Sequence, residues 1–496
     1  MLANDQTNKT HIYYSLKDNE TYMKQTLGAD VSYDIDFREV VVLDTNVQLY
    51  YVNGLVDDAN ITQLLKKIVS INDDEIEKEK VWEIIDNRLV NQQVEVTQSL
   101  DEAVDQLLSG LIIIFVDKQS KGFIVDVRRY PARSPEEPDT ERVIRGSRDG
   151  FTENILENTA LTRRRIRDER LRHEMLNVGE RSKTDVCVCY LQDVANDTLL
   201  KNIKDKISTI EIDGLTMADK ALEEFMSKQL WNTYPLVRYT ERPDVAADHI
   251  LDGHIVIMVD TSPSVIVLPT TFFDHLEHAE ESRQTPAIGT FIRWIRLLAV
   301  IGSLYLLPLW LLFVLDPSLL PEKLSFIGPN ESSNIPIFWQ ILLADIGVEF
   351  MRMAAVHTPT PLATAMGLIA AVLIGEIAVD VGMFTPEVIL YVAISTIGNY
   401  VTPSYELSVA NRITRLFLLV ITALFGLKGF VIGIVIQILH LVNIRSIYVP
   451  YLWPLIPFNG GALLQFLIRF PASKKYKRPL FVRPKNVYRR PKQAVK

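Results

Sequence analysis

The feature that most constrains this chain is an uncharged apolar stretch of membrane-spanning length. The segment LLAVIGSLYLLPLWLLFVL, Leu297–Leu315, runs for 19 residues without a charge. A transmembrane helix needs about 20 apolar residues, so this segment predicts a membrane span. Arg283, Arg293 and Arg296 precede it. By the positive-inside rule, the start of the span should face the cytosol.

Further apolar segments predict a multi-span transmembrane domain over residues 283–450. The other candidates are 338–356, 361–382, 386–404 and 413–444. GLKG interrupts the last one at 426–429, which predicts two short arms around a turn that either cross twice or dip in and return. Both arrangements keep the number of full crossings even, whereas a single helix makes it odd. Because the N-terminus lacks an apolar signal-peptide region and the tail 451–496 is basic, we expect both termini in the cytosol.

Ionisable residues inside these segments are the candidate functional residues. Asp345, Glu349 and Arg352 follow at i, i+4 and i+7, so they form one stripe of a helix. A charge at a helix centre costs about 2.5–3.5 kcal/mol, so the stripe should face protein or water. Two roles remain open. The residues form ion pairs that hold helices together, such as Glu349 with Arg352 or Glu376 with Arg352, or they line a polar conduit for ions. The predicted pore-lining or intramembrane polar residues are Asp345, Glu349, Arg352, Glu376, Asp380, Glu406, Arg412 and Arg415.

The N-terminal half contains an internal repeat at a constant offset of 143 residues. DEAVDQLLSGLIIIFVDKQSKGFIV, from Asp101, matches DVAADHILDGHIVIMVDTSPSVIVL, from Asp244. Each copy predicts a helix, a glycine stop, a buried strand, a turn and a second strand. The stretches 111–116 and 254–259 should therefore hold equivalent places in two sheets, and the aspartate after each should end the strand.

The predicted fold class is α/β plus an α-helical membrane domain, with two related cytosolic α/β subdomains followed by a multi-span transmembrane helical bundle. A polar N-terminal tail at 1–30 precedes the first subdomain, 31–130. A linker with an Arg-rich helix, 131–180, separates it from the second subdomain, 181–282. The arginines of that helix either bind an anionic partner or lipid head groups, or they form a solvated face paired with nearby acids.

The sequence predicts no enzyme. It contains no phosphate-binding loop, no H-E-x-x-H and no G-x-S-x-G. Cys187 and Cys189 stand at i, i+2 on a strand, where geometry disfavours a bridge, and the pair His275 and His278 lies among acids in a wet linker helix. We therefore expect no catalytic, cofactor-binding or metal-binding residues. The net charge of −9 averages over unlike parts, and no nucleic-acid partner is expected.

Four segments carry a family resemblance. They are YYVNGLVD (50–57), ERVIRGSRDGFTENILENTALTRRRIRD (141–168), TERPDVAADHILDGHIVIMVDTSP (240–263) and VTPSYELSVANRITRL (401–416). These long motifs resemble the A-subunit branch of the GerA family of spore germination proteins, and the resemblance runs from about residue 31 to the basic tail. One departure is Ser147, where the family usually has proline, and it affects a single turn.

The resemblance implies a protein of the inner membrane of the bacterial endospore, with two α/β subdomains in the cytosol. It implies A-type subunits that assemble as a homo-oligomeric ring and release monovalent cations during germination. Within the family, the chain is most similar to a member that acts beside a small membrane partner and other germination proteins and amplifies release without sensing a nutrient. The expected function is thus a channel subunit surrounded by membrane lipids. The alternative is a non-conducting membrane scaffold that docks other germination proteins.

Overall fold

A computed structural model describes residues 10–73, 81–89, 93–129, 141–227, 231–329, 335–357, 367–368 and 373–489. The chain divides into two compact units. The α/β unit comprises Met1–Lys228, Tyr239–Pro269 and Ser473–Lys496, and the helical unit comprises Gln229–Arg238 and Thr270–Ala472. Residues 361–366 and 369–372 of the predicted span 361–382, and the front of the predicted linker, lie outside the described residues.

The α/β unit contains two five-stranded sheets with the same strand order. The first sheet runs β1-β2-β4-β5-β3 and the second runs β6-β7-β9-β10-β8. The strands of the first are β1 Ile35–Val42, β2 Thr45–Val52, β3 Val94–Thr97, β4 Ile112–Val116 and β5 Gly122–Val125. Those of the second are β6 Leu171–Val178, β7 Thr184–Leu191, β8 Arg238–Thr240, β9 Ile255–Val259 and β10 Val265–Leu268. β4 and β9 hold the same central place, which confirms the predicted equivalence of 111–116 and 254–259.

The residues after these two strands are equivalent as well. The backbone N–H of Asp117 donates to the Asn46 carbonyl and that of Asp260 donates to the Asp185 carbonyl, both at 2.9 Å. Each aspartate directly follows its strand, as the repeat predicts. Before the strands, Gly110 and Gly253 have φ values of 92° and 99°. Glycine adopts this left-handed conformation without strain, which is why a glycine ends the helix in both copies.

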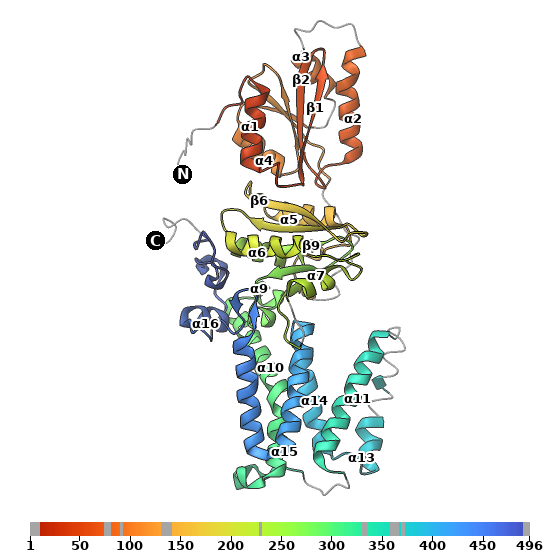
Figure 1. The fold of residues 1–496 in the computed structure, drawn as a ribbon, viewed down its shortest axis with the longest axis vertical. Coiled ribbons are helices and arrows are strands. Elements are labelled where there is room, and N and C mark those ends of the chain that lie inside the picture. Colours follow the sequence, from red (N-terminus) through yellow and green to blue (C-terminus); the bar gives the residue numbers. More distant parts are fainter. Residues whose placement is uncertain are drawn as a thin grey trace. The chain divides into compact units, whose positions relative to one another are not determined.

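Helices cover both faces of the first sheet. α1 (Leu16–Leu27) and α4 (Leu100–Leu108) share a core with one face, and α2 (Asp58–Val69) and α3 (Val81–Arg88) share a core with the other (Figure 1). A 3₁₀ turn, Ser70–Asp73, follows α2. Because β4 is covered on both sides, all five of its residues are buried, which explains its unbroken apolar sequence.

The second sheet carries α5 (Ile155–Arg165), α6 (Asp197–Ser208), α7 (Ala218–Met226) and α8 (Pro243–Asp252). α5 and α8 contribute side chains to one core with β7 and β9. Cys187 and Cys189 of β7 are buried in that core and form no disulfide. Burial raises the pKa of both thiols. They therefore act as small apolar residues.

The structure moves three of the expected boundaries. α1 lies within the expected polar tail 1–30, and its Leu16, Met23 and Leu27 are buried. These residues share one helix face, but the polar residues between them hide the pattern. β6 lies within the expected linker, where it is an edge strand with weak alternation. The segment 473–489 belongs to the α/β unit and is not a loose tail, since Phe481 and Val482 are buried.

The helical unit holds the apolar half of the chain. Its helices are α9 Ala279–Arg283, α10 Pro286–Leu315, α11 Ile337–His357, α13 Ala378–Asp380, α14 Pro386–Tyr400, α15 Tyr405–Asn443 and α16 Gly460–Leu467. Short 3₁₀ turns lie at Asp274–Leu276, Pro317–Leu319 and Glu322–Ile327, a π-helical turn lies at Leu373–Ile377, and a small hairpin joins β11 (Arg445–Ser446) to β12 (Val449–Pro450). Among the described residues, α10 and α15 are long and apolar enough to cross a membrane.

α15 is a hairpin of two helical arms. Its helical geometry breaks at Gly426, which has φ 55° and ψ −135°. Beyond the break the chain turns back, because Gly433 packs against Leu418 and Gly429 packs against the Ile421 backbone. The arms, 405–425 and 427–443, are about 30 and 25 Å long at 1.5 Å per residue. The structure thus has the predicted two arms around a turn.

Candidate functional site

The ionisable residues of α11 meet arginines from the first arm of α15. We call Asp345, Glu349, Arg352, Arg412 and Arg415 the ionic cluster. The first three lie on α11, and the other two lie one turn apart on α15. The stripe predicted on 338–356 therefore faces protein, and the structure brings together five of the eight predicted residues.

Asp345 and Arg415 form the most deeply buried pair of the ionic cluster. Their side chains are 4% and 1% exposed, and Arg415 Nη2 donates to Asp345 Oδ1. Arg415 Nη1 also donates to Ser395 Oγ of α14 at 2.7 Å and to the Ser303 carbonyl of α10 at 3.1 Å. Ser395 Oγ in turn donates to the same carbonyl at 2.9 Å. One arginine therefore joins four helices.

Glu349 forms the centre of a second, shallower group. It pairs with Arg412 of α15 and with Arg352 on its own helix. Arg352 Nε donates to Glu349 Oε1 at 3.0 Å, and Arg352 Nη1 donates to the Tyr405 hydroxyl at 2.7 Å. The expected Glu349–Arg352 pair thus forms. The expected partner Glu376 lies exposed instead, and Tyr405 and Glu349 hold Arg352.

The charge balance of the ionic cluster is positive. It contains two carboxylates and three guanidinium groups, so its formal charge is +1 when all are ionised. Buried charges in protein are stable when they are paired and hydrogen-bonded. This arrangement binds α11 to α14 and α15, and it weakens the negative field that the stripe alone would create.

The other three predicted residues lie apart from the ionic cluster. Glu376, in the π-helical turn, and Asp380, at the end of α13, are both exposed. Glu406 is half-buried in the first turn of α15, where its carboxylate accepts a hydrogen bond from Ser404 Oγ at 3.0 Å. Ser404 Oγ also accepts from the Leu407 N–H at 3.3 Å and caps the helix.

Sequence reasoning missed the neutral members of this site. Ser303 and Ser395 are 2% and 0% exposed, and both meet Arg415. Asn399 of α14 is 1% exposed, and its amide, oriented with the oxygen toward Arg412, accepts from Nη2 at 2.7 Å. In the sequence, each of these residues is marked only as a lone polar residue in an apolar helix. Such residues are too common to single out without knowing which helices pack together.

A second buried ionic group joins the two α/β subdomains. Arg163 of α5 and Asp34, just before β1, are 0% and 1% exposed and pair at 2.8 Å. His173 Nδ1 of β6 lies 3.1 Å from the same carboxylate. Burial alone would raise the pKa of Asp34, but Arg163 overcomes this and holds it well below its usual range. Burial lowers the pKa of His173, so it is neutral at pH 7. Of the arginines in the predicted linker helix, Arg163 therefore pairs with an acid of its own chain.

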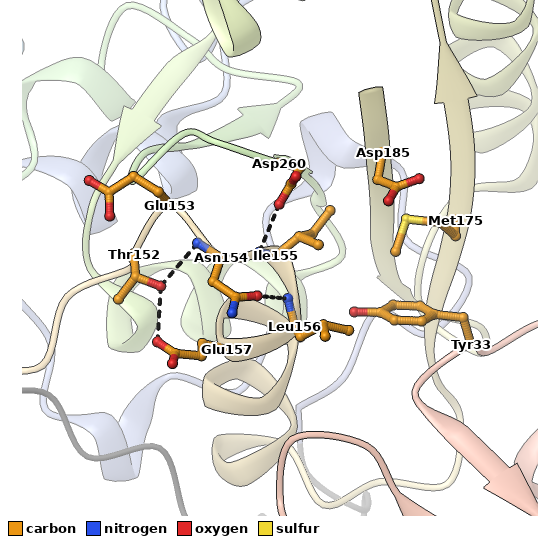
Figure 2. A pocket seen from close by; sticks show the side chains of 10 residues that line it. All are labelled: Tyr33, Thr152, Glu153, Asn154, Ile155, Leu156, Glu157, Met175, Asp185 and Asp260. Carbon is orange, nitrogen blue, oxygen red and sulfur yellow. Dashed lines mark hydrogen bonds between the residues drawn. The ribbon is translucent and has the colours of Figure 1, made fainter. Parts of the chain in front are cut away.

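The α/β unit also contains a hollow of about 820 Å³ at the start of α5 (Figure 2). Its polar groups largely bind one another: Asn154 Oδ1 accepts from the Leu156 N–H at 2.9 Å, and Asp260 Oδ1 accepts from the Ile155 N–H at 3.3 Å. The lining residues are Tyr33, Thr152, Glu153, Asn154, Ile155, Leu156, Glu157, Met175, Asp185 and Asp260. Four of them are acidic, so the hollow repels anions.

The two histidines that were considered as a pair of metal ligands lie in environments that differ from each other. His275 is buried, and burial lowers its pKa to about 3. His278 Nδ1 accepts a hydrogen bond from the Glu280 N–H at 3.1 Å and caps α9. In the described part of the chain, no group of three His, Cys, Asp or Glu residues could hold a metal ion.

These features define a class: paired α/β subdomains joined to a helical unit with membrane-competent helices and a buried ionic cluster. The family model described as Bacillus/Clostridium GerA spore germination protein matches residues 21–481. The chain is 55% identical to Stage V sporulation protein AF of Bacillus subtilis (strain 168), over 97% of this chain and 98% of that protein. It is 28% identical to Spore germination protein KA of the same organism, over 94% of this chain and 86% of that protein.

Among solved structures, the chain is similar to the N-terminal domain of the A subunit of the Bacillus megaterium spore germinant receptor GerK3. The identity is 26% and the TM-score is 0.43, covering 53% of this chain and 98% of that one. The family match spans most of the chain. The protein belongs to the GerA family of spore germination proteins, as its sequence motifs predict.

Proposed function

We propose that the chain is a non-enzymatic subunit of an oligomeric ion channel in the inner membrane of the endospore. The channel releases monovalent cations and amplifies the germination response. The exposure of Glu376 and Asp380, between α11 and α14, carries this proposal. A carboxylate within a membrane span costs about 2.5–3.5 kcal/mol in lipid. These two side chains therefore need water or another subunit beside them.

A homo-oligomeric ring satisfies both needs. One copy of the 376–380 segment from each subunit surrounds the ring axis, and the resulting ring of carboxylates attracts cations and repels anions. This assigns the pore lining to Glu376 and Asp380. The α11 stripe has the opposite character, since Arg412 and Arg415 neutralise its carboxylates. We assign the ionic cluster to helix packing.

The proposed partners follow from the relatives. Stage V sporulation protein AF and Spore germination protein KA are named for sporulation and germination, and each matches nearly the whole of this chain. A role beside a small membrane protein and other germination proteins is therefore proposed here. The α/β unit, which has no membrane-competent helix among its described residues, would serve assembly and gating.

Cation efflux from liposomes tests the channel. Liposomes that are loaded with potassium and contain the full chain should release potassium faster than loaded liposomes without protein. The double variant Glu376→Gln/Asp380→Asn should assemble normally and lose several-fold in cation flux and in preference for cations over anions. Glu322→Gln is the matched control, because Glu322 is exposed in the turn between α10 and α11. If the double variant conducts with unchanged rate and preference, these carboxylates do not line the pore.

One observation favours the alternative, a non-conducting scaffold. The charges of the ionic cluster are paired with one another, as they are in structural helix interfaces. With a scaffold, potassium efflux would be no faster than from loaded liposomes without protein, and the chain would still co-purify with other germination proteins. Glu349→Gln separates the roles further: we expect it to lower the yield of folded protein and to leave the ion preference of the surviving channels unchanged.

A further inference from the structure

The chain beyond α15 exposes apolar side chains where a basic tail was expected. Residues 451–470 contain a single charged residue, Arg469. Several large apolar side chains there are exposed, and Phe458 is 74% exposed. The others are Leu455, Ile456, Leu464, Ile468 and Phe470. Soluble proteins rarely expose a contiguous apolar patch of this kind, so it marks a contact surface.

This stretch is fixed against the start of α10. Trp294 Nε1 donates to the Leu467 carbonyl at 2.8 Å, and the Arg469 N–H donates to Thr290 Oγ1 at 3.1 Å. The guanidinium of Arg469 also donates to the Ser282 carbonyl at 2.7 Å. In Figure 1, α16 lies crosswise to the long helices α10 and α15. A helix crosswise to a membrane span lies in the plane of the membrane.

The first turns of α10 continue the same apolar surface. Ile288, Phe291 and Ile295 are 49%, 64% and 50% exposed, and their i, i+3, i+7 spacing places them on one helix face. The uncharged segment of α10 begins only at Leu297. The exposed apolar face therefore extends beyond the predicted span, toward the side where the membrane surface would lie.

We propose that residues 455–470 and the face of Ile288, Phe291 and Ile295, together called the interfacial surface, lie in the head-group layer of a phospholipid bilayer. The inference rests on the membrane location within the proposed function. Aromatic and aliphatic side chains on a helix parallel to the membrane bury themselves at the boundary of head groups and acyl chains. Arg445 and Arg469 lie before and within the stretch, where lipid phosphates are the complementary anions.

A bilayer fits this surface better than a second copy of the chain does. The surface is continuous with α10, which is long and apolar enough to span a membrane, so lipid already borders it. It also includes Trp294, which is 52% exposed although its Nε1 donates to the Leu467 carbonyl. Tryptophan is enriched at membrane interfaces.

Fluorescence quenching tests the location. Phe458→Cys and Leu464→Cys, made separately in the full chain, are labelled with bimane and reconstituted in phosphatidylcholine vesicles. The native Cys187 and Cys189 are buried, so the unaltered chain should take up almost no label. We expect both labels to be quenched by lipids with a nitroxide near the head group, less by lipids with a nitroxide deep in the chain, and little by aqueous iodide.

Asp213→Cys is the aqueous control, because Asp213 is 77% exposed in the α/β unit. Its label should be quenched by iodide and not by lipid. Iodide quenching of the labels at 458 and 464 equal to the control would overturn the proposal. Shielding from both quenchers would also overturn it, because a second protein surface would then cover the site. The quenching does not depend on ion flux. A protein that releases no potassium in the efflux assay but carries lipid-quenched labels would refute the channel and still support the interfacial surface.

Discussion

Asp345 and Arg415 depend on each other at the scale of single residues. Both side chains are almost inaccessible, so water cannot compensate either charge. Removing one partner of a buried pair typically costs about 3–5 kcal/mol, whereas replacing both with apolar residues of similar size is often close to neutral. The identity of each partner is therefore constrained by the presence of the other.

Arg415→Met should destabilise the folded chain by about 3–5 kcal/mol, because it leaves Asp345 buried without a partner. The thermal unfolding midpoint of the full chain in detergent measures the loss. Asp345→Leu combined with Arg415→Met should recover most of it. Lys323→Met, at an exposed position, is the matched control. A single variant as stable as the unaltered chain would show that this pair is not needed for folding.

The titration of Asp274 should make the free energy of unfolding depend on pH. Burial, with Glu277 adding repulsion, raises the pKa of its carboxyl to about 7. A carboxyl whose folded pKa exceeds its unfolded value of about 4 binds more protons in the folded state. Its stabilising contribution is therefore complete below about pH 4 and is lost as the pH rises through about 7.

The variant Asp274→Asn removes this titration. Compared with the variant, the unaltered chain should become progressively less stable between about pH 4 and pH 7, and the gap should stay constant above that. Unfolding midpoints measured across the range provide the comparison, with Glu322→Gln as a variant that should follow the unaltered chain. Parallel curves for the Asp274 variant and the unaltered chain would contradict the raised pKa.

At the scale of elements, the repeat shows what a sequence can predict. The copies at Asp101 and Asp244 share a helix, a glycine stop and two strands, because each pattern is set by local conformation and by burial of both strand faces. α1 was misplaced for the opposite reason, since its role depends on α4, which is distant in sequence. β6 was misplaced although its partner β7 is the next strand, because an edge strand alternates only weakly. The ionic cluster shows the same limit: the charges were visible, but the pairing of Asp345 with Arg415 depends on how α11 meets α15.

The turn of α15 gives a prediction at this scale. A Cβ on Gly429 would overlap the carbonyl oxygen of Ile421, whereas a Cβ on Gly302 of α10 meets open space. Gly429→Ala should therefore force the two arms apart and cost about 1–3 kcal/mol, the usual range for overpacking. Gly302→Ala should be neutral or slightly stabilising, since alanine favours helix. The fraction of monodisperse protein in detergent and its unfolding midpoint distinguish the two. Equal behaviour would mean that the arms are not closely packed at Gly429.

At the scale of the whole molecule, the two ends of the helical unit lead to the same α/β unit. The main segment of the helical unit begins at Thr270 and ends at Ala472, and the segment 473–489 is part of the α/β unit. There Arg489 Nη2 donates to Asp248 at 3.0 Å, and Lys475 Nζ lies 3.2 Å from Asp252. A chain that starts and ends its membrane passage on one side must cross an even number of times.

An even number of crossings requires α15 to be a hairpin. The sequence predicts one crossing for each of the segments 297–315, 338–356, 361–382 and 386–404. With those crossings, the two arms of α15 keep the predicted count even, whether both cross or both dip and return. A single straight helix would make it odd and would place 473–489 on the side opposite the remainder of its own unit. In this predicted topology, the break at Gly426 returns the C-terminal segment to the side of its own unit.

Cysteine labelling from outside intact cells tests this topology. Lys477→Cys, in the C-terminal segment, and Asp213→Cys, in the α/β unit, should react with a membrane-impermeant maleimide only after the cells are permeabilised. Glu322→Cys, in the turn that follows α10, should react in intact cells, because the positive-inside rule predicts that α10 begins on the cytosolic side and crosses once. All three positions are exposed, so a difference in reactivity reports the side of the membrane and not burial. Reaction of Lys477→Cys in intact cells, with Asp213→Cys still protected, would give an odd count. The segment 473–489 could not then pack against Asp248 and Asp252 of its own chain in the membrane, and α15 would have to cross as one helix.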